Sequence, residues 1–367
     1  MRHAGSVAIS TALLALGLAA SAAAADDPIG KRLSKAVGGG APAAGARTVP
    51  SFTDAFSFNG VTYPYRMVGT NPKTSTATTT VPSEIVPLRF EFADGAVFDA
   101  TTRAADVKAS PMFAPASFDS GTTQFGDAFR RAEFWDSVSA NGGGYHVLLG
   151  EPSVLPTVTI NVPKSQGVTG VANGVPYGLV DFNWWYRNAT ERLIGKLHID
   201  PASLPVFISD AVYTYWDNDP QSCCIIAVHG TVADWGGEGP INGRGRQQVN
   251  TFVAATWEYP EHFGDGGLAD PGTNGGTEAL SHEVAEWYDD PFETNRAPAW
   301  FSPIAPWYGC NDWLEVGDPL VSAERMVNGF NLQDEAFLSW FAHDVPSRGI
   351  NGRYTMFDTF KEPSTLC

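Results

Sequence analysis

The sequence predicts an α+β fold: a mixed or antiparallel sheet, a β-rich N-terminal portion packed against it, and a helix that the later strands support. Two observations lead to this prediction. Apolar and polar residues alternate with the period of a strand in the first half of the chain. Three further strand-like runs then precede a segment whose apolar residues have helical spacing.

The start of the chain has the features of a secretory signal peptide. A short basic start, an apolar run and a small-residue site at Ala25 predict cleavage after residue 25. The Gly/Ala/Pro-rich stretch that follows predicts a flexible leader over residues 26–48. No later apolar run reaches the about 18 residues that a membrane-spanning helix needs. We therefore expect a secreted protein, extracellular or periplasmic.

Residues 49–367 remain for folded structure, and the sequence leaves their division open. They form either one α+β domain, or a β-rich subdomain at 49–165 beside a motif-bearing portion at 166–367. No linker-like composition separates the two parts.

The charge of the chain argues against some partners. Lys and Arg number 23 against 40 Asp and Glu, giving a formal net charge of −17. This charge repels phosphate backbones and anionic lipid surfaces. Nucleic acid is therefore not an expected partner. The motifs described below, and not the charge, make a peptide or a cell-wall polymer the expected substrate class.

The cysteine residues predict two disulfides, because an oxidising compartment favours pairing of an even number of cysteines. Adjacent cysteines rarely bridge each other, since their Cα atoms are too close in ordinary geometry. Cys223 and Cys224 are therefore each expected to reach one of Cys310 and Cys367. The alternative is a soft-metal site at the adjacent pair, although its spacing differs from that of zinc sites.

The chain before the motif contains the following predicted elements. Strands are predicted at 85–92 and 157–163, and a helix between them in TQFGDAFRRAEFWDSV, residues 123–138. A second helix is predicted at 181–197, with Asp181 as its N-cap. The Trp184, Trp185 and Tyr186 cluster in that helix is interpreted as core packing rather than as a sugar-binding platform.

The later strands are predicted at 204–208, 223–232 and 247–259, and a glycine-rich loop then leads to ALSHEVAEWYDDPF, residues 279–292. On a helix, His282 and Glu286 share one face, and an apolar stripe of Leu280, Val284 and Trp287 lies opposite. A solvated acidic face opposite an apolar face would give the same pattern. The sequence thus allows both a metal-binding helix and an ordinary surface helix.

Two features of this helix favour a bound cation. Ala279 and Ala285 flank His282, so its face is small and partly apolar. Acidic residues at the C-terminal end also oppose the helix macrodipole, at a cost of roughly a few tenths of a kcal/mol each unless a cation compensates. A metal ion would be such a cation.

The spacing resembles the H-E-x-x-H pattern, in which two ligands lie one turn apart and the intervening glutamate is the general base for a metal-bound water. Here the second ligand position is Glu286, and the general base is Glu283. A histidine and carboxylate pair suits Zn²⁺ best, and each exchange of imidazole for carboxylate moves the preference toward Mn²⁺ or Ca²⁺.

A third metal ligand has to come from another part of the chain or from the end of the helix. Asp318 and Glu315 in NDWLEVGDPL are the preferred candidates, followed by Asp290. The remaining candidate is His229, but a lone histidine on a buried strand is more often a core residue.

The segment SHEVAEWYDDP followed by LEVGDPL resembles a group of secreted bacterial proteins of undefined function, with an H-E-x-x-E-x-x-x-D-P helix and an E-x-G-D turn. The similarity extends to TQFGDAFRRAEFW, the cysteine pair, NRAPAW and NGRYTMF. The two motifs are more distantly similar to the plant EXORDIUM or phosphate-induced protein 1 family, which has Asn where this chain has Asp290. The resemblance implies an extracellular, zincin-like protein and singles out these residues: His282, Glu283, Glu286, Pro291, Glu315, Gly317 and Asp318.

Two functions from different classes follow from these observations. The first is a secreted metal-dependent hydrolase, a zincin-like peptidase, with Tyr288 or His343 as candidates to stabilise the oxyanion. The second is a non-catalytic extracellular or cell-wall-associated binding protein with a structural metal at the same residues. A serine hydrolase is not expected, because the chain has no G-x-S-x-G motif.

Overall fold

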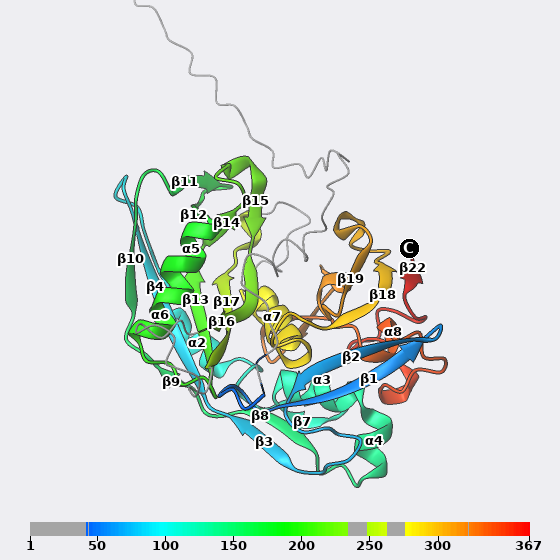
Figure 1. Cartoon of the computed structure of the whole chain (residues 1–367). Helices are drawn as coiled ribbons and strands as arrows, with labels where there is room; N and C mark the ends of the chain where they lie inside the picture. Colours follow the sequence, from blue (N-terminus) through cyan, green and yellow to red (C-terminus); the bar gives the residue numbers. More distant parts are fainter. Residues whose placement is uncertain (1–41, 43, 234–247, 263–275, 322) are drawn as a thin grey trace, which may run out of the picture.

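The computed structural model describes residues 42, 44–233, 248–262, 276–321 and 323–367 (Figure 1). The predicted signal peptide and most of the predicted leader lie outside the described residues, as do residues 263–275 of the glycine-rich loop. Within the described part of the chain, no helix is both long enough and apolar enough to cross a membrane.

The fold is a mixed α+β arrangement built on one large sheet, with central strand order β10-β4-β13-β17-β16. The first four of these strands run parallel to one another, and β16 pairs antiparallel with β17 at the edge. The sheet is therefore mixed, which was one of the two predicted arrangements, the other being antiparallel. Its strands are β4 (Ser83–Phe92), β5 (Val97–Asp99), β9 (Ser153–Val154), β10 (Val158–Val162), β13 (Leu204–Asp210), β16 (Ala227–Ala233) and β17 (Val249–Trp257).

The predicted alternation along β4 is confirmed: Leu88, Phe90 and Phe92 are buried, whereas Arg89 and Glu91 are only partly covered. Since β4 pairs with both β10 and β13, strands from residues 49–165 and 166–367 share this sheet.

One face of the large sheet is covered by the predicted helix at 181–197, which consists of α5 (Phe182–Trp185), the π-helix η1 (Tyr186–Glu191) and α6 (Arg192–Lys196). Asp181 caps it, because its carboxylate accepts a hydrogen bond from the backbone N–H of Trp184. Trp185 is buried in the core, and Trp184 and Tyr186 pack against the same cluster. The cluster is thus core packing, as predicted.

The opposite face of the sheet carries α7 (Glu278–Asp289), the predicted motif helix, which packs on β17 and β16. Its apolar stripe of Leu280, Val284 and Trp287 enters the core, as expected. Its acidic face is buried as well, so the solvated-face interpretation is wrong. Figure 1 shows why: α7 lies in the middle of the molecule, between the large sheet and the part formed by β1, β2, β18 and β19.

The N-terminal part of the chain adds several small layers around α7. The predicted helix in TQFGDAFRRAEFWDSV divides at Phe134 into α3 and α4. A Cβ on Gly126 would lie 2.5 Å from the Tyr288 ring, so glycine permits close packing of α3 on α7. The elements of this part are β1 (Ser51–Phe58), β2 (Val61–Val68), β3 (Thr78–Val81), α2 (Arg103–Ala109), β6 (Ala116–Phe118), β7 (Gly121–Thr123), α3 (Phe125–Glu133), α4 (Trp135–Ala140) and β8 (His146–Leu149).

The remaining elements form a second, four-stranded sheet and the C-terminal part. The sheet contains β11 (Gly167–Ala172), β12 (Val175–Asp181), β14 (Val212–Tyr215) and β15 (Cys223–Ile225). The C-terminal part contains β18 (Arg296–Phe301), β19 (Asn311–Trp313), β20 (Glu324–Val327), β21 (Phe330–Gln333), α8 (Leu338–Phe341) and β22 (Thr365–Leu366). Short 3₁₀ helices are η2 (Pro220–Ser222), η3 (Pro260–His262), η5 (Pro306–Tyr308), η6 (Asp318–Leu320) and η7 (Ile350–Gly352).

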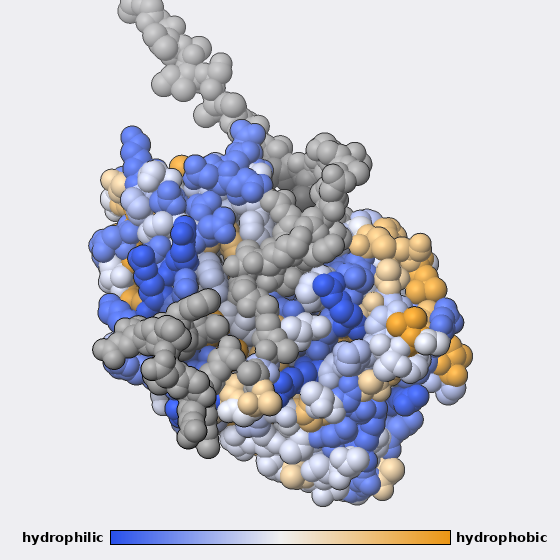
Figure 2. All heavy atoms as spheres, in the orientation of Figure 1, coloured by the Kyte–Doolittle hydropathy of each residue, from blue (hydrophilic) through white to orange (hydrophobic). Residues whose placement is uncertain are grey.

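The surface in Figure 2 is mainly hydrophilic, in keeping with the acidic composition. Hydrophobic atoms gather toward the edge where β18 and β22 lie, and the exposed apolar side chains there include Phe301, Ile304 and Leu366.

The chain has two disulfides, as predicted, but the predicted pairing is wrong. Cys223 pairs with its neighbour Cys224, and Cys310 pairs with Cys367. The prediction assumed a trans peptide bond between the adjacent cysteines, whereas this bond is cis and their Cα atoms lie 3.0 Å apart. Both thiols are used in the bridge, so the alternative of a soft-metal site at the pair is also not supported.

Candidate metal centre

The centre of α7 brings together two groups of side chains that could hold a metal ion. One consists of His282, Glu286 and Asp318, and the other of His229, Glu283 and Glu286. In each group the three ligand atoms lie within 4.8 Å of one another. Glu286 belongs to both groups, so its carboxylate is the centre of the arrangement.

The first group joins the motif helix to the E-x-G-D turn, as the sequence predicted. His282 and Glu286 are one helical turn apart, and His282 Nε2 lies 3.1 Å from Glu286 Oε2. The turn places Asp318 Oδ1 3.8 Å from the same nitrogen. Four ligands with bonds of 2.0–2.1 Å in a tetrahedron are separated by roughly 3.4 Å, so these distances fit a common ion.

The ring orientation of His282 is set by a contact on its far side. Gln333 Nε2 donates to the carbonyl of Gly317 at 2.8 Å, which leaves Gln333 Oε1 as an acceptor. This oxygen lies 3.1 Å from His282 Nδ1, which therefore carries the proton. The Nε2 atom then faces Glu286 and Asp318, and its lone pair is available to a metal ion when the ring is neutral.

The carboxylate of Glu286 is fixed in the same way. Its Oε1 accepts hydrogen bonds from the backbone N–H groups of Gly317 at 3.0 Å and Asp318 at 3.3 Å. Only Oε2 is directed toward the histidines. The turn that supplies Asp318 therefore also orients Glu286.

Gly317 has a steric reason to be glycine. A Cβ at this position would lie 2.5 Å from His282 Nδ1, much closer than side chains tolerate. Its φ is −87°, so the requirement is for space and not for an unusual backbone conformation. The resemblance singled out this residue, and the close approach of the turn to His282 explains why.

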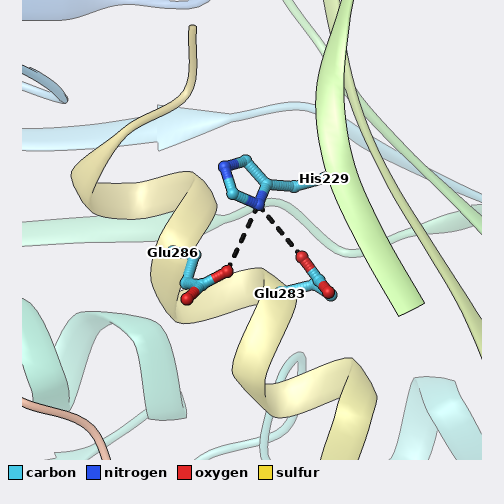
Figure 3. A group of neighbouring side chains, drawn as sticks. All are labelled: His229, Glu283 and Glu286. Atoms are coloured by element: carbon cyan, nitrogen blue, oxygen red, sulfur yellow. Dashed lines mark hydrogen bonds and ion pairs between the residues drawn. The ribbon is translucent and has the colours of Figure 1, made fainter. Parts of the chain in front are cut away.

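The second group includes His229, the last-ranked candidate for the third metal ligand in the sequence analysis. His229, on β16, is 4% exposed, and its Nδ1 lies 3.0 Å from Glu283 Oε2 and 3.5 Å from Glu286 Oε2 (Figure 3). Its Nε2 lies 3.2 Å from the backbone carbonyl oxygen of Asp290. Instead of being an isolated core residue, His229 faces the acidic side of α7.

Glu283 lies between the two histidines. Its Oε2 contacts His229 at 3.0 Å, and its Oε1 is 4.0 Å from His282 Nε2. One carboxylate oxygen is thus directed toward each group.

The other predicted ligands do not belong to either group. The Asp290 carboxylate accepts hydrogen bonds from the backbone N–H groups of Thr294 and Asn295, both at 2.9 Å, and so closes the turn after α7. Glu315 Oε2 lies 3.8 Å from His229 Nε2 and has no hydrogen-bond partner although it is buried. Pro291 follows the C-cap of the helix.

The predicted oxyanion stabilisers are not at the centre. Tyr288 is fully buried and donates a hydrogen bond to the carbonyl of Val147. His343 stacks on Phe58 and lies 2.9 Å from the Ser364 hydroxyl. Both were chosen without a spacing argument, which explains the error. Tyr308 is closer, since its side chain is hydrogen-bonded to the Asp318 carboxylate.

The negative charge at the C-terminal end of α7 was predicted to be compensated by a metal ion, but the structure places an arginine there. Arg130 of α3 lies 2.7 Å from the Asp289 carboxylate and 3.2 Å from that of Glu133, and all three side chains are completely buried. It also donates to the carbonyl of Tyr288 at the end of the helix. At Asp289 the compensating cation is therefore an arginine and not a metal.

The candidate metal centre has no such arginine. In the part of the chain that the structure describes, the ion pairs of Glu283, Glu286, Glu315 and Asp318 involve only histidine. Burial raises the pKa values of Glu315 and Asp318 well above their usual range, and the charge of Glu286 adds to the effect. Uncompensated buried carboxylates are costly. The oxygen and nitrogen donors and the unpartnered Glu315 oxygen thus fit a bound divalent cation.

The histidines and Glu286 influence one another strongly. Burial alone would lower the pKa of His282, but Glu286 and Glu283 raise it well above its usual value. Burial would raise the pKa of Glu286, but the charges of His282 and His229 bring it well below its usual range.

Sequence reasoning undervalued His229 and missed Gln333 and Tyr308. His229 lies 54 positions before Glu283 and shares no local spacing with the motif. One signal was present: β16 directly precedes β17, the strand on which α7 packs, so a polar residue on this face of β16 was expected to contact the helix.

Comparisons of the chain with protein families, curated proteins and solved structures found no match.

Proposed function

We propose that the chain is a secreted, metal-dependent hydrolase with a zincin-like helix, which holds Zn²⁺ through His282, Glu286 and Asp318 and uses Glu283 as its general base. The observation that carries this proposal is the fixed direction of His282 Nε2 and Glu286 Oε2 toward one point beside Glu283. The nitrogen and oxygen donors favour Zn²⁺, and the two carboxylates leave Mn²⁺ or Ca²⁺ as alternatives.

A divalent ion at this position would polarise a substrate carbonyl and make water a stronger acid. The chain supplies the group that accepts the proton. Glu283 Oε1 faces the first ligand group, and His229 holds Oε2 at 3.0 Å, so the carboxylate cannot rotate freely. His229 therefore acts as a positioning residue for the base.

A peptide is the proposed substrate class, because the spacing of His282, Glu283 and Glu286 is similar to that of the metal-binding helix in enzymes that hydrolyse amide bonds. Export is supported by the predicted signal peptide and by the two disulfides, which persist in oxidising compartments.

The second candidate function is a non-catalytic extracellular or cell-wall-associated protein with a structural ion. Burial favours it: Glu283, Glu286 and Asp318 are only 3–6% exposed. Structural sites are closed by protein ligands, whereas catalytic sites keep a position open. A structural ion does not need Glu283 as a base.

The Glu283→Gln variant distinguishes the two functions. The full exported chain, loaded with zinc, is assayed on a peptide library beside Glu283→Gln and the matched control Glu151→Gln, whose side chain is 83% exposed. We expect the wild type and Glu151→Gln to cleave the same peptides, and Glu283→Gln to lose at least about 100-fold in rate, as removal of a general base does.

Zinc content is measured for all three proteins. Equal cleavage by Glu283→Gln and the wild type would overturn the proposed role of Glu283. Zinc binding without cleavage by any of the proteins would support the structural ion instead.

A further inference from the structure

The two ligand groups meet at a single oxygen atom. Glu286 Oε2 lies 3.1 Å from His282 Nε2 and 3.5 Å from His229 Nδ1. The two histidines come from different elements, α7 and β16, and approach this oxygen with one ring nitrogen each. Figure 3 shows the approach of His229.

The outer nitrogen of each histidine already has a partner that can only accept. His229 Nε2 faces the backbone carbonyl of Asp290, and His282 Nδ1 faces Gln333 Oε1. Each outer nitrogen therefore carries a proton. The inner nitrogen of each ring faces carboxylate oxygens, either as the second N–H of an imidazolium or, once that proton is released, as a ligand of a cation that it shares with the carboxylates. The same argument applies independently on both sides of Glu286.

Each side also has its own further carboxylate. Asp318 Oδ1 completes the group around His282, and Glu283 Oε2 completes the group around His229. The two ligand sets are thus alike in composition, with one imidazole nitrogen, one separate carboxylate and the shared Glu286. Such mixed nitrogen and oxygen sets suit Zn²⁺ and Mn²⁺.

The negative charge of the centre also favours two divalent cations. When ionised, Glu283, Glu286, Glu315 and Asp318 carry four negative charges, and their side chains are all at most 8% exposed. Among the described residues, neither Lys nor Arg forms an ion pair with them. When both histidines are neutral, as metal ligands are, one divalent cation balances half of this charge and two balance all of it. Glu315 Oε2 is buried without a hydrogen-bond partner and lies 3.8 Å from the outer nitrogen of His229, so it adds negative charge close to the second group.

We propose that the centre holds two divalent cations, one in each ligand group, with Glu286 bridging them through Oε2. The proposal rests on the metal group of the proposed function and adds a second ion at His229, Glu283 and Glu286. The second ion binds Glu283 through Oε2, the oxygen that faces His229. The other oxygen of Glu283 remains directed toward the first group, where it accepts the proton.

Zinc stoichiometry tests the proposal. The full exported chain is stripped with a chelator, titrated with Zn²⁺ in a calorimeter, and analysed for zinc after gel filtration. We expect two zinc ions per wild-type chain and one per chain in both His229→Ala and His282→Ala. Glu286→Gln should retain neither ion, because it removes the shared ligand. His198→Gln is the matched control, since this exposed histidine lies outside both groups, and it should retain two.

One zinc ion per wild-type chain would overturn the proposal, and so would an unchanged count in His229→Ala. Folding is checked by circular dichroism. If His229→Ala does not fold, His229→Gln replaces it, because an amide keeps a donor for the Asp290 carbonyl. Its expected count is also one, and a count of two would contradict the second site.

This result is separate from that of the proposed function. Two zinc ions per chain without peptide cleavage would support the dinuclear centre and contradict the hydrolase. Peptide cleavage with a single zinc ion per chain would support the hydrolase and contradict the dinuclear centre.

Discussion

Helix α7 carries two buried acidic regions that are stabilised in different ways. At its C-terminal end, Asp289 pairs with Arg130, which also holds Glu133, and the three side chains are completely buried. Earlier in the helix, Glu283 and Glu286 form ion pairs only with histidines among the residues that the structure describes. An arginine is always charged, so the first region already contains a permanent cation. A histidine can give up its proton and bind a metal, so the second region is suited to an exchangeable cation. The comparison separates a structural ion pair from a candidate metal centre on the same helix.

The largest expected effect comes from removing the arginine. Arg130→Met leaves Asp289 and Glu133 buried without a cation, so the free energy of unfolding should fall by roughly 3–5 kcal/mol in urea. The loss should be the same with zinc and with chelator, because this region does not depend on metal. Arg348→Met is the control, since its ion pair with Asp344 is exposed and should contribute little. Equal losses in the two variants would remove the basis of the comparison.

Metal removal should affect the other region only. Each bound zinc ion, at 100 to 1,000 times its dissociation constant, should stabilise the wild type by about 3–4 kcal/mol, and excess chelator should abolish this effect. Thermal unfolding with and without chelator measures it. The difference should persist in Arg130→Met and disappear in Glu286→Gln, which removes the ligand that both groups share. If the wild type melts at the same temperature in both conditions, the second region is not a metal centre.

A smaller effect is expected from the turn that orients the ligands. In Gly317→Ala the new Cβ would meet His282 at 2.5 Å and push the turn away from the helix. Because partners outside the ligand set affect metal affinity by about 10- to 100-fold, zinc affinity should fall by at least about tenfold. Competition with a coloured chelator measures the affinity. Gly195→Ala has open space around the new Cβ and should bind zinc as the wild type does; equal affinities in both variants would show that the close approach is unimportant.

An effect of similar size is expected from Glu278, an acid on α7 that forms no ion pair with the other residues that the structure describes. Burial raises the pKa of Glu278 from 4.5 to about 7 in the folded chain. The folded state therefore holds a proton that the unfolded chain releases at lower pH, and this contribution to stability is lost as pH rises from 4.5 to about 7. Glu278→Gln should remove this dependence.

Urea unfolding at pH 5 and pH 8 checks this prediction. Relative to the wild type, Glu278→Gln should gain roughly 1–3 kcal/mol of stability between the two pH values. The same difference at both pH values would mean that Glu278 ionises normally in the folded protein.

Local patterns predicted much of the fold. The alternation along β4 predicted a strand, and helical spacing predicted α3 from Phe125 and Phe129 and α7 from Leu280. These predictions succeeded because periodicity reflects which side chains are buried. Periodicity does not say what covers the opposite face. The acidic side of α7 was therefore compatible with solvent, although β16 and the turn at Asp318 bury it.

The candidate site could be predicted only in part. His282 and Glu286 share a helix face, Asp318 was a candidate from its place in NDWLEVGDPL, and Gly317 came from the resemblance of the turn. His229 and Arg130 come from distant segments, and only the packing of β16 and α3 on α7 brings them to the helix. The pairing of Cys223 with Cys224 depends on the cis bond between them, which the sequence did not indicate.

The most direct test of the central claim is the zinc content of the exported full-length chain, measured by elemental analysis after zinc loading and gel filtration. Glu286→Gln is analysed beside it, because Glu286 belongs to both ligand groups. We predict that the wild type retains at least one zinc ion per chain and that Glu286→Gln retains none. A wild type without bound zinc, or equal zinc in the two proteins, would contradict a metal centre on α7.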